Sequence, residues 1–427
     1  MSVNALFHRA AHPAGGHHPE RVGTRVRASC TLGRAVSWLS RATGRGAGEV
    51  IGGRVILALA PEAPRRLALG HDVALVSGTN GKTTTSRMLA AALGTLGPVD
   101  TNGNGANTAA GFVTALADGH ADRVVLETDE GWLPWAVAQV APTTVVLLNL
   151  SRDQLSRHHE VAHLSTAWRA PLADVGVVVA NADDPDTVWP ALAARHQVWV
   201  AAGQRWIQDS GTCPSCGGQC RRDETGWGCA CGLRRPKPDW WLEGDELVSR
   251  TLRLPLELSL PGAYNRANAA MAVAAAVTQG ADPATAVARI RGIETVAGRY
   301  AWRRVGAHRI RLLLAKNPAG WLEIVDLVRD TRTPLVLAFN SEGVDGRDPS
   351  WLYDVSFVAL AGRPLVVTGR RATDMQVRLE MDGLAPTVVR GGVRAAVATL
   401  PAGPVDVLAN YTAFRDALRE LNHADGH

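Results

Sequence analysis

A lysine beside two glycines stands directly after an apolar segment, and this spacing suits phosphate binding. The apolar segment 73–77 leads into the string GTNGKTT, which starts at Gly78, and the residues after it favour a helix. Glycines let backbone N–H groups surround a phosphate at a helix N-terminus, where the helix dipole favours negative charge. Lys82 can then reach the terminal phosphates of a nucleotide, and the Thr83 hydroxyl can bind Mg²⁺. We therefore predict an ATP site, although Val76 stands where the usual phosphate loop has its first glycine.

A carboxylate closes the next apolar segment. Glu127 ends the run 124–127 within the string LETDEGWLP. At the carboxyl end of a parallel strand beside a phosphate loop, such a side chain is well placed to bind Mg²⁺. The alternative is a solvated acidic turn formed by Glu127, Asp129 and Glu130. We expect Glu127 to bind magnesium.

Five of the six cysteines lie in one short segment that begins at Cys213. Cytosolic cysteines at this density are more often thiolate ligands than disulfides. Four of them would form the closed tetrahedral site of structural zinc, which folds a small module that lacks its own core. The Zn²⁺ ligands that we favour are Cys213, Cys216, Cys229 and Cys231, with Cys220 as the alternate. Cys30 stands alone and is expected to be a packed small side chain.

The composition indicates a globular protein. The 427 residues are 46% hydrophobic, which is enough for two or three domains with sizeable cores. No apolar run approaches the roughly 20 residues that cross a bilayer, and the first 26 residues lack the apolar stretch of a signal peptide. The net charge is +5, but the arginines are dispersed, so we predict no nucleic-acid partner. We expect a cytoplasmic protein.

Apolar segments separated by helical patterns predict an α/β fold. Val- and Leu-rich runs suggest parallel strands that are covered on both faces, and they begin at Val73, Val124, Thr144 and Val175. Alternating residues after the cysteines predict antiparallel strands. Helices are predicted over 31–45, 265–278 and 283–291.

The same patterns divide the chain into three parts. A disordered tail is predicted at 1–26, and an ATP-binding domain at 27–300 carries the cysteine-rich insertion at about 207–236. After it the α/β rhythm restarts, with apolar runs that include FVALAG at 357–362. We therefore predict a C-terminal α/β domain at 301–427.

Several strings taken together resemble one enzyme family. Besides the glycine loop and Glu127, they include Asn149, Arg152 and Asp153, and the string LPGAYNRANAAMA that leads toward Arg299. This combination resembles the Mur ligase family, whose members form amide bonds by phosphorylating a carboxylate with ATP. The cysteine segment, KNPAG and DPSWLYD narrow the resemblance to the MurT branch, the ATP-dependent subunits of lipid II isoglutaminyl synthase. It spans about residue 35 to the C-terminus.

The resemblance implies a fold, a reaction and a partner. The fold is a P-loop central domain with a parallel sheet and an inserted zinc ribbon, followed by an α/β domain. The partner is a GatD-like glutaminase, whose ammonia amidates the α-carboxyl of D-glutamate in the lipid II stem peptide at the membrane surface. The cofactors are ATP, Mg²⁺ and Zn²⁺. Peripheral contact with the inner membrane face is therefore an alternative to a purely cytoplasmic location.

The family's site residues carry over to matching positions. Lys82, Glu127 and Asp348 are implied as the catalytic residues, with Thr83 and Glu127 binding Mg²⁺. Asp348 would complete the Cys–His pair of the partner glutaminase, although on the residues alone it equally suits an ordinary helix cap. The residues implied in ATP binding are Gly78, Thr79, Asn80, Gly81, Lys82, Thr83, Thr84, Asn268 and Arg299.

Two departures leave alternatives open. Ser156 replaces an acidic residue, and the stretch 163–175 lacks the lysine that ordinary Mur ligases carbamoylate. Arg169 cannot replace that lysine, because a guanidinium stays protonated and forms no carbamate. A second Mg²⁺ is therefore held differently or is absent. The alternative functions are a stand-alone amino-acid ligase of the Mur or folylpolyglutamate type and, ranked lower, a zinc-ribbon ATPase that binds nucleic acid.

Overall fold

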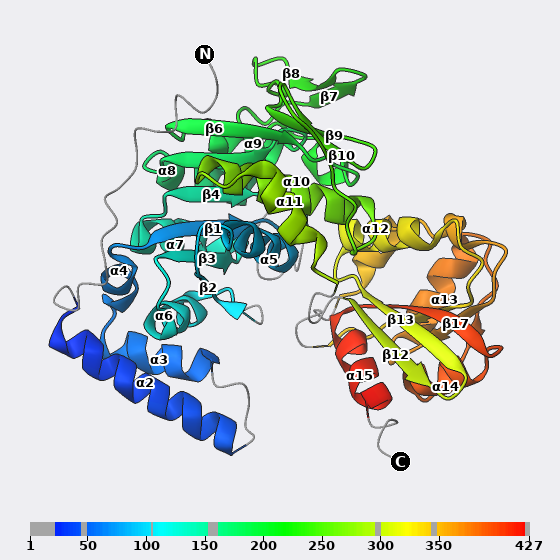
Figure 1. Cartoon of the computed structure of the whole chain (residues 1–427). Coiled ribbons are helices and arrows are strands. Elements are labelled where there is room, and N and C mark those ends of the chain that lie inside the picture. Colours follow the sequence, from blue (N-terminus) through cyan, green and yellow to red (C-terminus); the bar gives the residue numbers. More distant parts are fainter. Residues whose placement is uncertain are drawn as a thin grey trace.

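The computed structural model describes residues 22–43, 49–103, 106–152, 161–294, 300–342 and 348–422. Three N-terminal helices lie at one end of a large sheet, and a smaller sheet with its own helices lies on the other side of the molecule (Figure 1). The N-terminal helices are α2 (Thr24–Ala42), α3 (Glu49–Leu59) and α4 (Ala63–Ala68).

Helix α2 differs from the prediction at its start. It begins at Thr24, so the predicted tail boundary at residue 26 and the predicted helix start at residue 31 are both too late. The reason is packing, because Val26 and Cys30 lie on one face of α2 and pack in a cluster with Ile56 of α3. Cys30 is therefore a packed small side chain, as predicted.

The large sheet has nine strands in the order β11-β10-β9-β6-β5-β4-β1-β3-β2. Strand β1 lies between β3 and β4 and is parallel to both, which confirms the predicted parallel α/β architecture. The predicted strands are β1 (Asp72–Ser77), β3 (Arg123–Thr128), β4 (Thr144–Leu147) and β5 (Val177–Asn181). Strands β2 (Val99–Thr101) and β6 (His196–Ala201) were not predicted.

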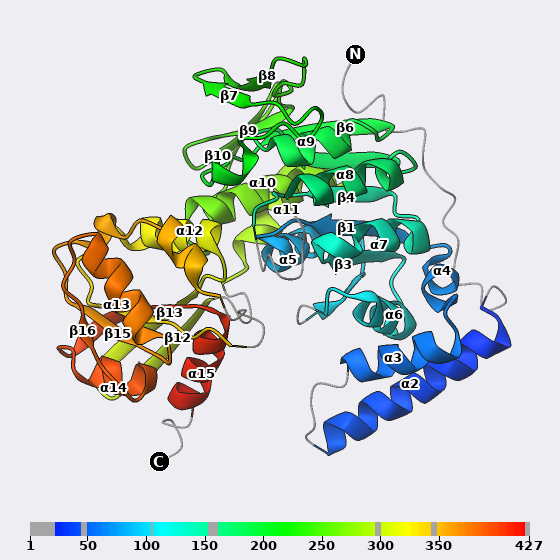
Figure 2. The same ribbon diagram turned by 180° about the vertical axis from the view of Figure 1, so that it is seen from behind.

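Helices cover both faces of this sheet (Figures 1 and 2). Side chains alternate along a strand, so Ala74 and Val76 pack in one core with α5 and α10, whereas Val73 and Leu75 pack in the other core. One face carries α5 (Lys82–Leu93), α10 (Ala263–Thr278) and α11 (Pro283–Arg291); on the other lie α6 (Ala109–Asp118), α7 (Leu133–Val140), α8 (Val161–Leu172) and α9 (Pro185–Ala191). None of the described helices has the length and apolar character needed to cross a membrane.

The segment after the cysteines forms the predicted antiparallel strands. These are β9 (Trp240–Glu243), β10 (Glu246–Ser249) and β11 (Arg253–Pro255). Strand β9 also pairs in parallel with β6, so the hairpin extends the large sheet. The cysteines themselves lie around a separate two-stranded sheet, β7 (Cys220–Asp223) and β8 (Gly226–Cys229).

The second sheet has six strands in the order β12-β13-β17-β14-β15-β16. Helices α12 and α13 cover one face, and α14 and α15 cover the other. The strands are β12 (Tyr300–Val305), β13 (His308–Leu314), β14 (Leu335–Ala338), β15 (Leu365–Thr368), β16 (Thr387–Val388) and β17 (Gly403–Ala409). The helices are α12 (Pro318–Val328), α13 (Ala372–Met381), α14 (Gly392–Ala398) and α15 (Tyr411–Asn422).

One apolar run of the second sheet's region is not a strand. FVALAG contains a 3₁₀ helix, η7 (Val358–Leu360), and a second 3₁₀ helix, η6 (Ser350–Asp354), precedes it. A strand at 357–362 would be followed almost at once by β15, which starts at Leu365. Parallel neighbours need a connection of a dozen or more residues, so this segment cannot be a parallel neighbour of β15. Phe357 and Leu360 are instead buried under α12 and α13.

Candidate active site

The glycine loop joins strand β1 to helix α5 at the centre of the large sheet. Gly78 and Gly81 both have positive φ angles, 142° and 88°, and Gly81 is the residue that caps the start of α5. A Cβ on Gly78 would lie 2.9 Å from the Asn149 carbonyl oxygen. A Cβ on Gly81 would clash with the side chain of Asn268, so both positions require glycine.

The segment after β4 holds this loop in place. The Asn149 side chain accepts a hydrogen bond from the Asn80 N–H and donates one to the Asn80 carbonyl, both at 3.0 Å. The Thr79 hydroxyl donates to the Ser151 carbonyl at 3.1 Å and accepts from the Ser151 N–H at 3.0 Å. Asn149, which resembled a family motif, therefore positions the loop.

Lys82 is buried, and its side chain bonds the backbone of the glycine loop. Its Nζ donates to the Gly78 carbonyl at 2.6 Å and forms an ion pair with Glu130 Oε2 at 2.8 Å. Burial would lower the pKa of Lys82, but Glu130 and then Glu127 raise it above its ordinary value. Lys82 is therefore charged at neutral pH.

Glu130 is the partner that the sequence did not single out. Burial would raise its pKa, but Lys82 and then Lys316 lower the pKa to about 2. Its backbone carbonyl accepts a hydrogen bond from the indole Nε1 of Trp168 on α8 at 2.8 Å. The acidic turn is thus not solvated: the exposed fraction is 4% for Glu127 and 4% for Glu130.

Glu127 lies at the end of β3, as predicted. Asn102 fixes its backbone by accepting from the Glu127 N–H at 2.7 Å and donating to the Glu127 carbonyl at 2.8 Å. Within the described part of the chain, the Glu127 carboxylate forms no hydrogen bond or ion pair. Glu127 is close enough to Lys82 to raise the pKa of that lysine, and the half-buried Thr83 is the next residue of the chain after Lys82. A buried carboxylate and a hydroxyl in this region are oxygen donors of the kind that Mg²⁺ binds.

A cavity of about 940 Å³ opens beside the glycine loop. Its walls include Asn80, Gly81 and Thr84 from the loop and helix α5, and Asn268 from α10. The second sheet's region contributes α12, so both halves of the molecule line the cavity. Thr79, Lys82 and Thr84 are buried at this end, and Asn268 reaches Gly81, so the predicted ATP-binding residues that the structure describes lie together.

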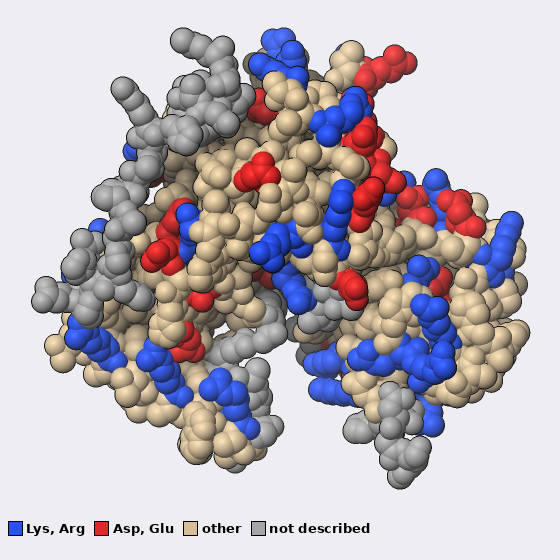
Figure 3. Space-filling view, viewed as in Figure 1, with Lys and Arg blue, Asp and Glu red and all other residues tan. Residues whose placement is uncertain are grey.

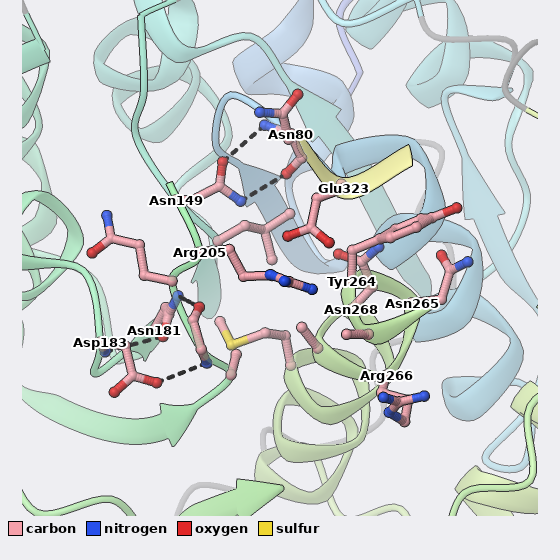
Figure 4. A pocket seen from close by; sticks show the side chains of 18 of the residues that line it. Asn80, Asn149, Asn181, Asp183, Arg205, Tyr264, Asn265, Arg266, Asn268 and Glu323 are labelled. Carbon is pink, nitrogen blue, oxygen red and sulfur yellow. Dashed lines mark hydrogen bonds between the residues drawn. The ribbon is translucent and has the colours of Figure 1, made fainter. Parts of the chain in front are cut away.

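Charged residues meet at the far wall of this cavity (Figure 4). Arg205 extends into it near Glu323 of α12 and Tyr264 of α10, and Arg205 also pairs with Asp326. Burial raises the pKa of Glu323 to about 7, partly offset by Arg205. Of these residues, Tyr264 alone lies in a string that the sequence analysis singled out, LPGAYNRANAAMA.

Two polar contacts join the loop region to the second sheet's region. The side-chain amides of Asn80 and Asn317 exchange hydrogen bonds of 3.2 and 3.1 Å. Arg152 pairs with Asp209 at 2.6 Å and with Asp354 of η6 at 3.0 Å. The KNPAG and DPSWLYD strings thus both contribute a residue that contacts the ATP-binding half.

Asp348 lies apart from the glycine loop's contacts. It is exposed, and its carboxylate accepts a hydrogen bond from the Ser350 N–H at 2.9 Å, which lowers its pKa. This bond is a local turn directly before η6, whose capping residue is Pro349, and a glutaminase role for Asp348 stays a prediction. Arg299, Asp153 and Ser156 lie outside the described residues. Arg169 stacks on Trp189 and donates to its carbonyl, which occupies the guanidinium.

Four cysteine sulfurs converge beyond the large sheet. The Sγ atoms of Cys213, Cys216, Cys229 and Cys231 all lie within 4.8 Å of one another. Cys220, the alternate ligand, is not part of this group and packs in a small core with Trp227. Four thiols at this spacing fit tetrahedral zinc. The structure thus brings together the set that we favoured.

Comparisons with known proteins agree with this architecture. Residues 76–204 match the Mur ligase middle domain, and residues 314–414 match the MurT ligase C-terminal domain. The MurT subunit of lipid II isoglutaminyl synthase from Staphylococcus aureus is 28% identical over 90% of this chain and 95% of that protein. Its counterpart from Streptococcus pneumoniae is 27% identical over 82% of this chain and 80% of that protein.

A solved structure shows the same fold. The pseudomurein peptide ligase type C from Methanothermus fervidus superimposes with a TM-score of 0.66 at 19% identity, and the match covers 87% of this chain and 84% of that one. The glycine loop with its buried lysine lies in the Mur ligase middle domain, and η6 lies in the MurT-specific region. The chain carries a Mur ligase middle domain and a MurT ligase C-terminal domain, and it is similar to MurT subunits over most of its length.

Proposed function

We propose that this chain is the ATP-dependent subunit of a lipid II isoglutaminyl synthase, a ligase of peptidoglycan synthesis. It would activate the α-carboxyl of D-glutamate in the stem peptide, and a GatD-like glutaminase would supply the ammonia. The observation that carries the proposal is the buried Lys82 in the glycine loop. The similarity to MurT subunits over most of the chain supports the choice of substrate and partner.

The residues present fit ATP and Mg²⁺. The positive-φ glycines leave the loop without side chains on its inner surface, and Lys82 and the start of α5 supply positive charge. Thr83 and Glu127 would hold Mg²⁺, and Asn268 would contact the adenine from the adjoining cavity wall. ATP would supply the phosphoryl group that converts the carboxylate into an acyl phosphate, and ADP would be the leaving group. Ammonia would then attack the acyl carbon, phosphate would leave, and loss of a proton from the nitrogen would give the amide.

The protein's own contribution is positioning and charge. Asn149 and Ser151 hold the loop, so it is preorganised before the nucleotide binds. In the structure, Lys82 bonds Glu130 and the Gly78 carbonyl. Glu130 therefore keeps the ammonium charged and stored beside the loop until phosphate oxygens compete for it.

Asp348 and the cysteines have separate roles in this proposal. Asp348 is exposed, so it can reach a partner protein and orient the histidine of the glutaminase. Zinc bound by Cys213, Cys216, Cys229 and Cys231 would be structural, because four protein ligands leave no position for substrate. Metal binding would fold the ribbon, whose own apolar core is small.

The test uses the full chain co-purified with a candidate glutaminase. Lipid II, ATP and Mg²⁺ are supplied with either glutamine or an ammonium salt, and the product is followed by mass spectrometry. We expect an amidated stem peptide with both nitrogen sources. Consumption of an amino acid by the chain alone would instead support the stand-alone ligase, and failure of both nitrogen sources would overturn the proposal.

A further inference from the structure

Helix α2 has two apolar faces, and the described elements cover only one of them. Its inner face packs with α3, where Val26 and Cys30 are buried. On the outer face three large side chains are exposed, with exposed fractions of 49% for Leu32, 65% for Trp38 and 55% for Leu39. The outer face, called here the α2 stripe, consists of the exposed residues Ala28, Leu32, Ala35, Trp38, Leu39 and Ala42.

The α2 stripe is continuous because of its spacing. Apart from the adjacent pair Trp38 and Leu39, its members follow one another at intervals of three or four residues, which places them on one side of an α-helix. A surface helix of a globular protein normally carries polar residues opposite its buried face. An exposed apolar face that includes a tryptophan therefore indicates an interaction surface.

Arginines border the α2 stripe, and α2 has no acidic residue. Arg27, Arg34 and Arg41 recur at every seventh position along one edge, and Arg25 lies at the other edge. Arg34 bonds Asp118, and Arg25 lies 3.9 Å from Glu62. Arg27 and Arg41 are exposed and form no ion pair with any described residue. The edge of the stripe is therefore positive.

The position of α2 leaves this face open to a flat partner. Figures 1 and 2 show α2 at the outer edge of the molecule, with α3 between it and α6. Figure 3 shows basic side chains on the part of the surface that these helices form. Arg54 of α3 and Arg65 and Arg66 of α4 are also exposed and add to its positive charge.

We propose that α2 binds an anionic lipid bilayer through the α2 stripe. Trp and Leu side chains would enter the boundary between headgroups and acyl chains, while the arginine stems lie along it and their guanidinium groups contact lipid phosphates. This pattern, an apolar stripe bordered by basic residues, matches the chemistry of interfacial helices. A second copy of this chain fits less well, because pairing two such faces would bring their arginine rows together.

This inference rests on the proposed function for its purpose, which is to hold the enzyme beside a lipid-linked substrate. Its evidence is independent, since neither the stripe nor the arginines belong to the ATP site. Binding to vesicles needs no ATP, glutaminase or lipid II. The two proposals can therefore fail separately.

The experiment measures sedimentation of the full chain with vesicles of phosphatidylglycerol and phosphatidylcholine. We expect binding to anionic vesicles that weakens as salt rises, and little binding to phosphatidylcholine alone. Trp38→Ser with Leu39→Ser should lower the partition coefficient by about tenfold or more, since each buried apolar side chain contributes strongly. Arg27→Glu with Arg41→Glu should lower it by at least about 25-fold, on the basis of about fivefold for each basic residue lost, and the two new negative charges add to this loss.

Two matched controls test whether replacing any exposed apolar or charged residue lowers vesicle binding. Met381→Ser removes an apolar side chain of similar exposure, 66%, from α13, and Arg250→Glu reverses an exposed charge far along the chain. Both variants should bind vesicles as the parent does. Equal vesicle binding by the α2 variants would overturn the proposal. So would a change of oligomeric state in those variants without a change in vesicle binding, because the stripe would then join two copies.

Discussion

The glycine loop and the segment around Asp348 were both predicted to take part in the reaction, but the structure builds them differently. The loop follows strand β1, which lies between the two cores of the large sheet, and its polar groups bond residues that are distant in the sequence, among them Asn149, Ser151 and Glu130. Asp348 is exposed and bonds only to Ser350, two residues away, among the described residues. The loop therefore finds its hydrogen-bond partners within this chain, whereas the carboxylate of Asp348 is exposed at the surface. A second protein would have to complete that second site.

The largest expected effect comes from breaking the loop. Lys82→Ala should lower amidation by about 100-fold or more, because it removes the charge that faces the phosphates. It would also leave Glu130 buried without its partner, at a cost of about 3–5 kcal/mol in the free energy of unfolding. Combining Lys82→Met with Glu130→Gln should recover most of that stability but no activity. Recovered activity would show that Lys82 is not needed for the reaction.

Two neighbouring glutamates sharpen the description of the loop. Glu130→Gln should lower the free energy of unfolding by about 3 kcal/mol, because it leaves Lys82 charged and buried. Glu127→Gln should change it by less than about 1 kcal/mol, because the Glu127 carboxylate has no partner to lose. Its effect should instead appear as a weaker Mg²⁺ dependence of ATP binding, measured by calorimetry. Equal unfolding curves for the two variants would contradict the assigned pairing.

A change at Asp348 should affect the two nitrogen sources, glutamine and ammonia, differently. Asp348→Asn should lower glutamine-dependent amidation by about tenfold or more while ammonia-dependent amidation stays unchanged. Asp354→Asn is the matched control, because it removes an acid that lies six residues further along, at the end of η6, and pairs with Arg152 instead. Parallel loss with both nitrogen sources in the Asp348 variant would show a structural role in this chain.

The last effect is a pH dependence of stability that two buried acids behind the loop produce. Asp184 accepts a hydrogen bond from the Leu150 N–H at 2.8 Å, and burial raises its pKa to about 6. Burial and then Asp184 raise the pKa of Asp186 to about 9. Both folded-state values exceed the unfolded value near 4, so their contribution to stability is complete below that pH and is lost as pH rises to about 9. Urea unfolding at several pH values should show this slope, and Asp186→Asn should flatten its upper part.

Sequence patterns predicted the parts of the site that depend on neighbours in the chain. The glycine spacing, the strand ends at Ser77 and Glu127, and the favoured cysteine set all correspond to features of the structure. Glu130 was missed because its burial depends on α8, through the bond from Trp168. The roles of Asn102 and Asn317 were missed for the same reason, since asparagines beside glycine or proline suggest turns and the partners of these two are distant in the sequence. Contacts between distant residues leave no local pattern.

The reciprocal amide pair between Asn80 and Asn317 has a thermodynamic consequence. Asn80 belongs to the glycine loop and Asn317 to the start of α12, so a rotation of the second sheet's region away from the first breaks a contact of the loop itself. If the loop binds nucleotide as proposed, nucleotide affinity and interdomain angle are linked variables. If nucleotide binding stabilises the closed arrangement by a certain free energy, closure strengthens nucleotide binding by the same free energy.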